Sequence, residues 1–510
     1  MSLPWLTLSW VTPAIGAAVV LLVPTSRRAL ANWMGLVFAI AVLAVAVVLV
    51  DGFDVGDVQY QFVESHRWIP TFGARYTVGL DGIALALVVL TAVLVPLLII
   101  AGWNDGAERG QSTRVYVALV LGVESLVLVS FVALDVLLFY VVFEAALIPL
   151  YFLIGRYGGT DRSRAALKFL LYNLFGGLVM LAAVVGVFVV AAGTGSHGTL
   201  DFRTLVDTAR NADPTIQKLL FLGFMTAFAV KAPLWPLHTW LPGVATSAKP
   251  ATAVLMMAIV DKVGTFGMLR YCLQLFPEAA TYFRPLIITL AVIAILFGAI
   301  VAIGQVDVMR LIAYTSISHY GFIVLGIFVM TSQGQAGSTL YMVNHGVSTA
   351  ALFLIAGFLV SRRGTRLISA YGGVRGVAPW LAGTFLVAGL SALALPGLAP
   401  FISEFLVLMG TFTRYPLAAV AASAALVLSA LYVLWAYQRM MTGPLADGNQ
   451  HLRDLVPRET AVVAPLIALL LALGIYPKPV LDVIVPAVSH TLTTIDEPDP
   501  APQLAEGPPR

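Results

Sequence analysis

The 510-residue chain has little charge and almost no cysteine. Only 11% of its residues are Asp, Glu, Lys or Arg, against about a quarter in soluble globular proteins. The single cysteine, Cys272, excludes an internal disulfide, a Cys-ligated iron–sulphur cluster and a cysteine-based zinc site. The net charge of +3 is too small to indicate nucleic-acid binding. The P-loop, dinucleotide-binding and HExxH motifs are also absent, so the sequence does not indicate a domain that binds or hydrolyses nucleotides.

What the chain has instead is long apolar runs, and 60% of its residues are hydrophobic. Runs of about 20 apolar residues match the thickness of a bilayer. They predict an all-α polytopic membrane protein with fourteen spans. The expected spans are 3–23, 30–50, 80–103, 114–132, 135–155, 168–192, 216–235, 250–273, 285–303, 308–330, 337–361, 379–412, 416–440 and 460–476.

The distribution of cations predicts the orientation of these spans. With the N-terminus outside, seventeen of the 29 lysines and arginines fall in cytoplasmic loops and ten fall outside, while Lys231 and Lys262 lie within spans. Because cytoplasmic loops are enriched in Lys and Arg, we expect both termini outside. The segment 489–510, rich in proline and acidic residues, is expected to be a disordered tail.

Two of the spans contain prolines next to a titratable residue. The stretch "AVKAPLWPLHTWLP" (229–242) holds Lys231, and "LALPGLAPFISEF" (393–405) holds Glu404. Proline removes a backbone donor and breaks a helix, and broken helices at corresponding positions of inverted repeats are typical of ion transporters. The two breaks lie five spans apart, an odd number, so we expect an inverted repeat with a break in each copy.

Ionisable side chains deep in a span cost several kcal/mol, so each is a candidate functional residue. Such residues lie throughout the predicted repeats: Glu124, Glu144, Lys231, His238, Lys262, His319, His345 and Glu404. Glu, Lys and His can each take and release a proton, whereas Arg cannot. No arginine is expected mid-span, which favours proton transfer over anion binding. A contact between Glu144 and Lys231 is a further hypothesis.

His319 and His345 allow two interpretations. They lie thirteen residues before and after Ser332, so a hairpin of spans 308–330 and 337–361 would place them at similar depth. They could relay protons between Lys262 and Glu404, helped by nearby hydroxyl groups on Ser316, Ser318, Tyr320 and Ser348. They could instead ligate a haem, which would make the chain an electron-transfer subunit.

Five motifs resemble the antiporter-like membrane-arm subunits of respiratory complex I, the proton-pumping NADH–quinone oxidoreductase. They are "LDVLLFYVVFEAALIPLYFLIGRYGG", "AVKAPLWPLHTWLP", "ATAVLMMAIVDKVGTFGMLRY", "QVDVMRLIAYTSISHYGFIVLGI" and "LALPGLAPFISEFLVLMG", in this order across about residues 80–440. Within this family the chain most resembles the M-type subunits. Glu404 stands where the L- and N-type chains usually carry lysine, and only a short stretch follows the last expected span.

The resemblance implies fourteen helices with two inverted repeats of five helices each, at 114–273 and 285–440. These lie between a first part at 1–79, a helix at 80–113 and a last helix with its flank at 441–488.

The resemblance also implies a role for each matching residue. Glu144 and Lys231 would form a modulating pair, and Lys262 would be the central proton-holding lysine. His319 and His345 would lie on a hydrated connection, and Glu404 near the outside exit. FMN, iron–sulphur clusters and quinone would belong to other subunits, with L- and N-type chains flanking this one in a bacterial cytoplasmic membrane.

The sequence departs from the family pattern in two places. Gly243 and Val244 stand where Asp and Ala commonly follow "HTWLP", and Met309 stands where Lys often precedes the arginine. The alternative within the same superfamily is a stand-alone or Mrp-type cation/proton antiporter chain.

Overall fold

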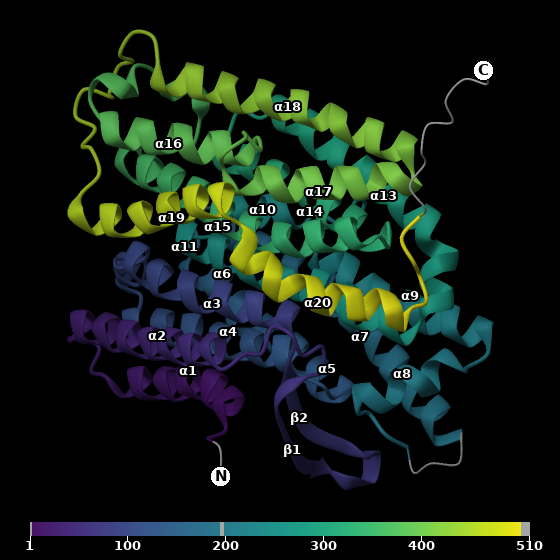
Figure 1. Ribbon diagram of the computed structural model, residues 1–510. Helices are drawn as coiled ribbons and strands as arrows, with labels where there is room; N and C mark the ends of the chain where they lie inside the picture. The colour runs from purple at the N-terminus through teal and green to yellow at the C-terminus, as the bar shows by residue number, and fades with distance from the viewer. Residues whose placement is uncertain (1–2, 194–197, 501–510) are drawn as a thin grey trace, which may run out of the picture.

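The computed structural model describes residues 3–193 and 198–500, and these form one helical body (Figure 1). The first part contains α1 (Trp5–Leu22), α2 (Arg28–Asp51), strands β1 (Gln61–Ile69) and β2 (Ala74–Leu80), and α3 (Gly82–Ala101). The middle contains α4 (Thr113–Val132), α5 (Val136–Ala145), α6 (Leu147–Tyr157), α7 (Arg162–Gly193), α8 (Phe202–Arg210), α9 (Pro214–Lys231), α10 (Leu241–Ser247), α11 (Pro250–Val254), η3 (Leu255–Val260), α12 (Asp261–Gly267) and η4 (Met268–Leu273). The last part contains α13 (Pro277–Ile303), α14 (Val308–Phe328), α15 (Ser332–Arg363), α16 (Pro379–Ala392), α17 (Ala399–Arg414), α18 (Pro416–Met441), α19 (Pro457–Ile475) and α20 (Lys478–Thr494).

Both η3 and η4 are π-helical, so α11 to η4 form one continuous helix with two widened stretches. Short 3₁₀ turns at η1 (Pro70–Phe72), η2 (Asp105–Gly110), η5 (Ile368–Ala370) and η6 (Val374–Gly376) lie in the connections. Several helices begin at an aspartate whose carboxylate accepts backbone N–H groups of the first turn, as Asp307 does at α14. This capping fixes where the apolar runs become helical.

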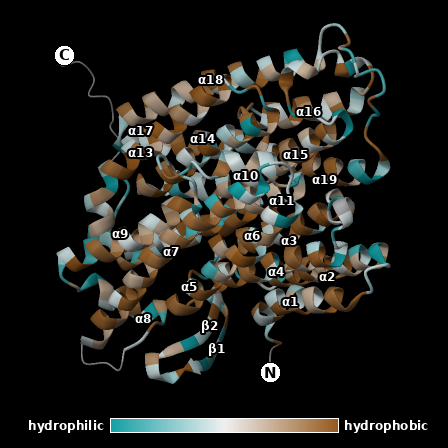
Figure 2. Ribbon diagram, turned by 180° about the vertical axis from the view of Figure 1, so that it is seen from behind, coloured by the Kyte–Doolittle hydropathy of each residue, from teal (hydrophilic) through white to brown (hydrophobic). Residues whose placement is uncertain are grey.

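Twelve helical segments of the described residues are long and apolar enough to cross a membrane. The two expected spans outside this set, 216–235 and 379–412, are the two with proline breaks. An all-α polytopic membrane protein is therefore confirmed, while the number fourteen stays a prediction. Figure 2 shows hydrophobic residues along the helices and hydrophilic residues in the hairpin and at helix ends.

Three helices form the centre of the body. All residues in the most apolar 18-residue stretch of the α11–η4 helix are buried. In the corresponding stretches of α14 and α15, 94% of the residues are buried. In contrast, only 33% of the residues in the corresponding stretch of α18 are buried, and this helix faces outward. The residues with most of the candidate chemistry therefore lie on helices that have almost no lipid-facing surface.

Both proline breaks appear where the sequence places them. Helix α9 ends at Lys231, and the chain runs through turns before α10 begins at Leu241. Helix α16 ends at Ala392, and α17 begins at Ala399 after a turn that contains Gly397 at φ +91°. The assignment of 114–273 and 285–440 to inverted repeats stays a prediction.

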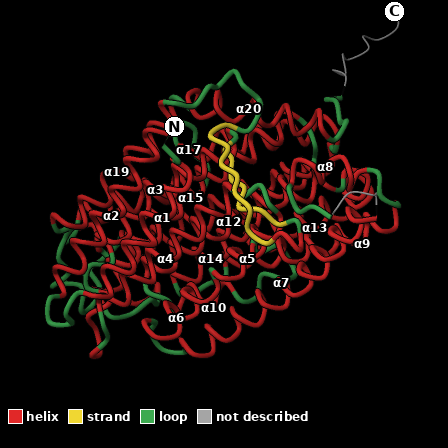
Figure 3. The backbone as a smooth tube through the Cα atoms, turned by 90° about the horizontal axis from the view of Figure 1, so that it is seen from below, coloured by secondary structure: helices red, strands yellow, loops and turns green. Residues whose placement is uncertain are grey.

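Two elements differ from expectation, and both lie near the chain ends. Residues within 51–79, expected to be a plain connection, form the antiparallel β1–β2 hairpin, which crosses the face of the helical body seen from below (Figure 3). Glu64 of this hairpin accepts hydrogen bonds from the backbone of α1, including Leu6 N at 2.9 Å.

The expectation of a disordered tail from residue 489 is wrong for its first part. Helix α20 continues to Thr494, because buried residues at helical spacing, Ile484, Ala487, Val488, Thr491 and Leu492, give it one packed face. Beyond it, Glu497 forms ion pairs with Arg284 and Arg414. Residues 501–510 of the expected tail lie outside the described residues.

Candidate proton-transfer site

Lys262 lies on α12 and is fully buried at the centre of the body. Its Nζ donates to the Met257 carbonyl at 2.7 Å and to the Tyr320 hydroxyl at 2.9 Å, and it lies 2.6 Å from His345 Nδ1. Met257 belongs to the π-helical η3, and its carbonyl also accepts from the Tyr320 hydroxyl at 2.7 Å. The amine therefore lies in a small polar cage whose third member can itself exchange a proton.

The two histidines lie side by side, as the predicted hairpin of α14 and α15 requires. The ring centroids of His319 and His345 are 5.3 Å apart, and the rings are perpendicular. His345 Nε2 lies 3.1 Å from Thr349 Oγ1, and His319 Nε2 lies 3.0 Å from the Ala392 carbonyl. Ala392 is the last residue of α16, so His319 contacts the backbone where that helix breaks.

A tyrosine completes the path from the histidines to Glu404. The Tyr341 hydroxyl donates to Glu404 Oε2 at 3.0 Å, and the Tyr341 ring centroid lies 5.6 Å from that of His319. Lys262, His345, His319, Tyr341 and Glu404 thus form one buried series from α12 to α17. The sequence predicted four of its five members; Tyr341 was missed because one tyrosine among seventeen carries no positional signal.

The predicted hydroxyl helpers serve different purposes. Tyr320 belongs to the cage around Lys262. Ser348 accepts from Ser391 Oγ at 3.2 Å near the α16 break, whereas Ser318 donates to the Ile295 carbonyl and ties α14 to α13.

Asn344 supports the second break from α15. Its Nδ2 donates to the Ala399 carbonyl at 2.7 Å and lies 3.2 Å from Ser403 Oγ. The side-chain amide thereby holds the first turn of α17, the helix that carries Glu404.

Glu144 and Lys231 lie close enough to interact electrostatically but do not form a direct ion pair within the described residues. Lys231 Nζ lies 4.5 Å from the centroid of the Phe143 ring. Neither this Nζ nor Glu144 Oε1 has a hydrogen-bond partner among the described residues. The two charges are therefore near each other and poorly satisfied, a state that a small movement can change.

Space for Glu144 comes from a glycine on α7. A Cβ on Gly177 would lie 1.8 Å from Glu144 Oε1 and 2.2 Å from its Cδ. Only a residue without a side chain leaves room for the carboxylate there. This role of Gly177 could not be predicted from the sequence, because Gly177 lies 33 residues from Glu144 on another helix.

The break after α9 is less open than the prolines suggest. Trp240 Nε1 donates to the Val230 carbonyl at 3.0 Å, so one of the freed carbonyls is already paired. Lys231 is 1% exposed.

Two predicted site residues lie apart from this series. Glu124 is buried in α4, and neither carboxylate oxygen has a hydrogen-bond partner in the described part of the chain. His238 is buried in the turns between α9 and α10, with its ring centroid 5.0 Å from that of Phe297.

The structure also contains buried charges that the sequence did not single out. Asp261, next to Lys262, is fully buried and interacts electrostatically with Lys262 and Lys231. Arg270 forms a 2.7 Å ion pair with Asp81 and is 2% exposed. It lies three residues before the end of the span expected at 250–273, not in its middle. This pair ties η4 to the start of α3.

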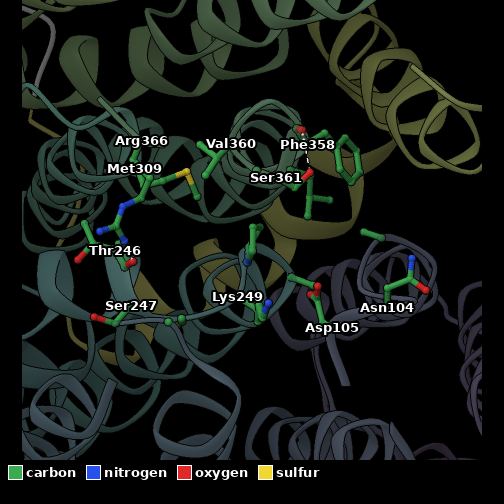
Figure 4. Close-up of a pocket in the computed structure, with 18 of the residues that line it drawn as sticks. Asn104, Asp105, Thr246, Ser247, Lys249, Met309, Phe358, Val360, Ser361 and Arg366 are labelled. Atoms are coloured by element: carbon green, nitrogen blue, oxygen red, sulfur yellow. Dashed lines mark hydrogen bonds between the residues drawn. The ribbon is translucent and has the colours of Figure 1, made fainter. Parts of the chain in front are cut away.

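A cavity of about 410 Å³, lined by both polar and apolar residues, opens at the end of the body where α11 begins (Figure 4). Lys249, Ser247 and Asp105 line it, and Arg366 lies at its side, paired with Asp307 at 3.1 Å. Lys262 lies twelve residues after Pro250, where α11 begins, and this corresponds to about 18 Å along the helix at 1.5 Å per residue.

The histidine pair does not fit a haem. Both ring nitrogens of His345 are engaged, one with Lys262 and one with Thr349. The rings of His319 and His345 are in contact at 5.3 Å, which leaves no space for a macrocycle between them.

A buried lysine, two histidines, a tyrosine and a glutamate in series, with broken helices beside them, are what an antiporter-like membrane subunit would need. A profile of the family described as NADH:quinone oxidoreductase/Mrp antiporter, TM, matches residues 133–429. NADH-quinone oxidoreductase subunit M of Mycobacterium tuberculosis (strain H37Rv) is 62% identical, covering 99% of this chain and 97% of its own length. Subunit M of Rhodobacter capsulatus is 39% identical, covering 90% of each. The chain belongs to this family, among its subunit M members, which confirms the resemblance inferred from the five motifs.

Solved structures show the same fold. A chain of respiratory complex I from Thermus thermophilus with bound NADH matches with a TM-score of 0.87 at 32% identity, covering 96% of this chain and 99% of that one. A chain of the Mrp complex from Dietzia sp. DQ12-45-1b matches with a TM-score of 0.86 at 20% identity, covering 97% and 100%.

Proposed function

We propose that this chain translocates protons as a membrane-arm subunit of an NADH–quinone oxidoreductase. The observation that carries the proposal is the buried series from Lys262 through His345, His319 and Tyr341 to Glu404. Each member can accept or donate a proton or a hydrogen bond, and the series lies on the most deeply buried helices. A series of this kind has no purpose in a purely structural membrane helix, because each buried ionisable group costs free energy.

The Glu144–Lys231 pair and the series from Lys262 to Glu404 have different roles. Glu144 and Lys231 act as a modulating pair: when they approach, each stabilises the charge of the other, and when they separate, the lysine releases its proton more easily. Lys262 holds the proton at the centre. His345 and His319 pass it on, and Glu404 is the terminal acid before the exit. Glu124 and His238 lie apart from this transfer series.

The driving energy comes from outside this chain. FMN, iron–sulphur clusters and quinone belong to other subunits of the complex, and L- and N-type antiporter-like chains flank this one. Their redox chemistry acts on Glu144 and Lys231 through charges along the membrane arm. The chain lies in a bacterial cytoplasmic membrane with both termini outside, so the Lys249 cavity faces the cytoplasm.

The test uses Glu144→Ala and Lys231→Ala in the assembled complex in membrane vesicles. Both variants reduce proton pumping and the coupled reduction of quinone, while NADH oxidation with an artificial acceptor is unchanged. Lys218→Ala, a partly exposed lysine on the same helix α9, is the matched control and keeps full pumping. Unchanged pumping in both variants would refute the assigned pair.

An Mrp-type or stand-alone cation/proton antiporter is the second candidate, supported by the shared fold. It would move protons without NADH. Sodium-driven proton flux in vesicles that contain this chain, measured in the absence of NADH, would favour it over the proton-pumping subunit.

A further inference from the structure

Asp261 is a buried carboxylate for which the series described above gives no role. It is 0% exposed, and neither carboxylate oxygen has a hydrogen-bond partner within the described residues. It is the first residue of α12, directly after the π-helical η3. A buried, unsatisfied carboxylate costs several kcal/mol, so its presence needs a reason.

The helix geometry directs Asp261 and Lys262 to different neighbours. Consecutive residues of an α-helix point about 100° apart. Lys262 points to α14 and α15, where Tyr320 and His345 contact its amine. Asp261 shares a face with Gly264, three residues later.

That face packs against the break after Lys231. A Cβ on Gly264 would lie 2.9 Å from Ala232 N and 3.0 Å from the Phe228 carbonyl, so α12 approaches the end of α9 as closely as backbones can. Asp261 therefore faces the end of α9 that carries Lys231.

Electrostatics agree with this placement. Lys231 interacts with two acids, Glu144 and Asp261, and Lys262 interacts with Asp261. Asp261 is the acid that the two lysines share. The helix α12 packs against α9, α4 and α3. Besides Lys231, the buried titratable side chains on these three helices are Glu124 and Tyr116, both on α4.

A simple counter-ion to Lys262 would form an ion pair with it. Instead, the Lys262 amine is engaged by the Met257 carbonyl, the Tyr320 hydroxyl and His345, and no ion pair joins it to Asp261 among the described residues. The carboxylate is left between the two lysines without being neutralised by a contact to either.

We propose that Asp261 is a further proton-carrying residue that links Lys231 to Lys262. The Lys231 ammonium gives a proton to the Asp261 carboxylate, which leaves a neutral amine and a carboxylic acid. The acid then gives the proton to the neutral Lys262 amine, which restores the carboxylate and leaves an ammonium at Lys262. One proton moves between the lysines and no other reactant is consumed. This step rests on the proton-translocating function proposed above.

The test compares Asp261→Asn, Asp261→Glu and Lys262→Met in the complete complex in vesicles, with exposed Asp207→Asn on α8 as the matched control. Asn keeps the volume of Asp but cannot carry a proton, so pumping and coupled quinone reduction fall about tenfold. Asp261→Glu restores pumping with a shifted pH profile, because a carboxyl group is again present at a different distance. Oxidation of NADH by ferricyanide, together with the native size of the complex, measures assembly.

Each outcome decides the proposal. Wild-type pumping in Asp261→Asn, with pumping lost in Lys262→Met, overturns the role of Asp261 and leaves the proposed function intact. Wild-type pumping in both variants overturns the proposed function itself. If Asp261→Asn does not assemble, Asp261→Glu decides alone: an unchanged pH profile overturns the proposal, and a shifted one supports it.

Discussion

Replacing Gly177 by alanine tests the site without removing any titratable group. The new Cβ would lie 1.8 Å from Glu144 Oε1, whereas ordinary contact begins at 3.4 Å, so the carboxylate must retreat by about 1.6 Å. The clashing atoms are the far end of a flexible side chain, which can rotate. Alanine is also the better helix former by about 1 kcal/mol, so the fold is retained.

The electrostatic effect follows from Coulomb's law. Two unit charges about 5 Å apart at an effective dielectric constant of about 20 interact with about 3 kcal/mol, and a shift of about 1.6 Å changes this by about 1 kcal/mol. That is about a fivefold change in the proton equilibrium between Glu144 and Lys231. We expect proton pumping per NADH to fall by a similar factor in Gly177→Ala.

The assay is proton uptake by inverted vesicles during NADH oxidation, with ferricyanide reduction as the measure of assembly. Gly193→Ala on the same helix is the control, because a Cβ there meets no atom within 4 Å. The double variant Gly177→Ala/Glu144→Ala should pump no less than Glu144→Ala, since the glycine acts through the carboxylate. Wild-type pumping in Gly177→Ala, or additive losses in the double variant, would refute this reasoning.

Three further predictions concern the path, the packing and the C-terminal segment. Tyr341→Phe removes a hydrogen bond to Glu404 worth about 1.5–3 kcal/mol and should slow pumping about tenfold or more with assembly intact; normal pumping would exclude Tyr341 from the path. Asp81→Asn leaves the Arg270 charge buried without its partner, which costs about 3–5 kcal/mol; thermal unfolding of the detergent-solubilised complex should occur at lower temperature, and an unchanged transition would contradict this. Burial works to raise the pKa of Glu497, but the hydrogen bonds and charges of its two arginine partners outweigh it and hold this pKa below the usual range. The anchoring is therefore complete above the ordinary pKa of a glutamate and lost as pH falls through the lowered one, so Glu497→Gln should make the segment after α20 sensitive to protease at neutral pH, as the wild type is only in acid.

The sequence predicted those parts of the site that are costly in lipid. Lys231, Lys262, His319 and Glu404 stand out because each violates the hydrophobic pattern of its span, and the prolines mark the breaks for the same reason. The hairpin of α14 and α15 followed from the equal distances of the two histidines from the turn. These are local signals, readable from one span at a time.

The parts that the sequence did not predict depend on contacts between helices. Gly177 matters only because α7 passes the end of α5. Tyr341 is an ordinary membrane aromatic until α17 approaches it. Asp261 was hidden by its neighbour Lys262, since an adjacent acid and base suggest a local pair, whereas the helix directs the two side chains to different neighbouring helices. Helix α20 was masked by prolines and acids that follow its buried face.

The burial of α12, α14 and α15 also determines what can screen the charges they carry. Mobile ions weaken interactions between exposed charges over about 10 Å at moderate salt, but they do not enter a close-packed interior. Lys262, His345 and Glu404 are at most 4% exposed, so they interact with one another at full strength in dilute and in concentrated buffer. Contacts such as that between Lys478 and Asp482 on the exposed side of α20 weaken as salt is added. Added salt therefore distinguishes two kinds of charge in this molecule. It weakens the interactions between exposed charges on the surface, and it leaves unchanged those between the buried groups of the proton-transfer series.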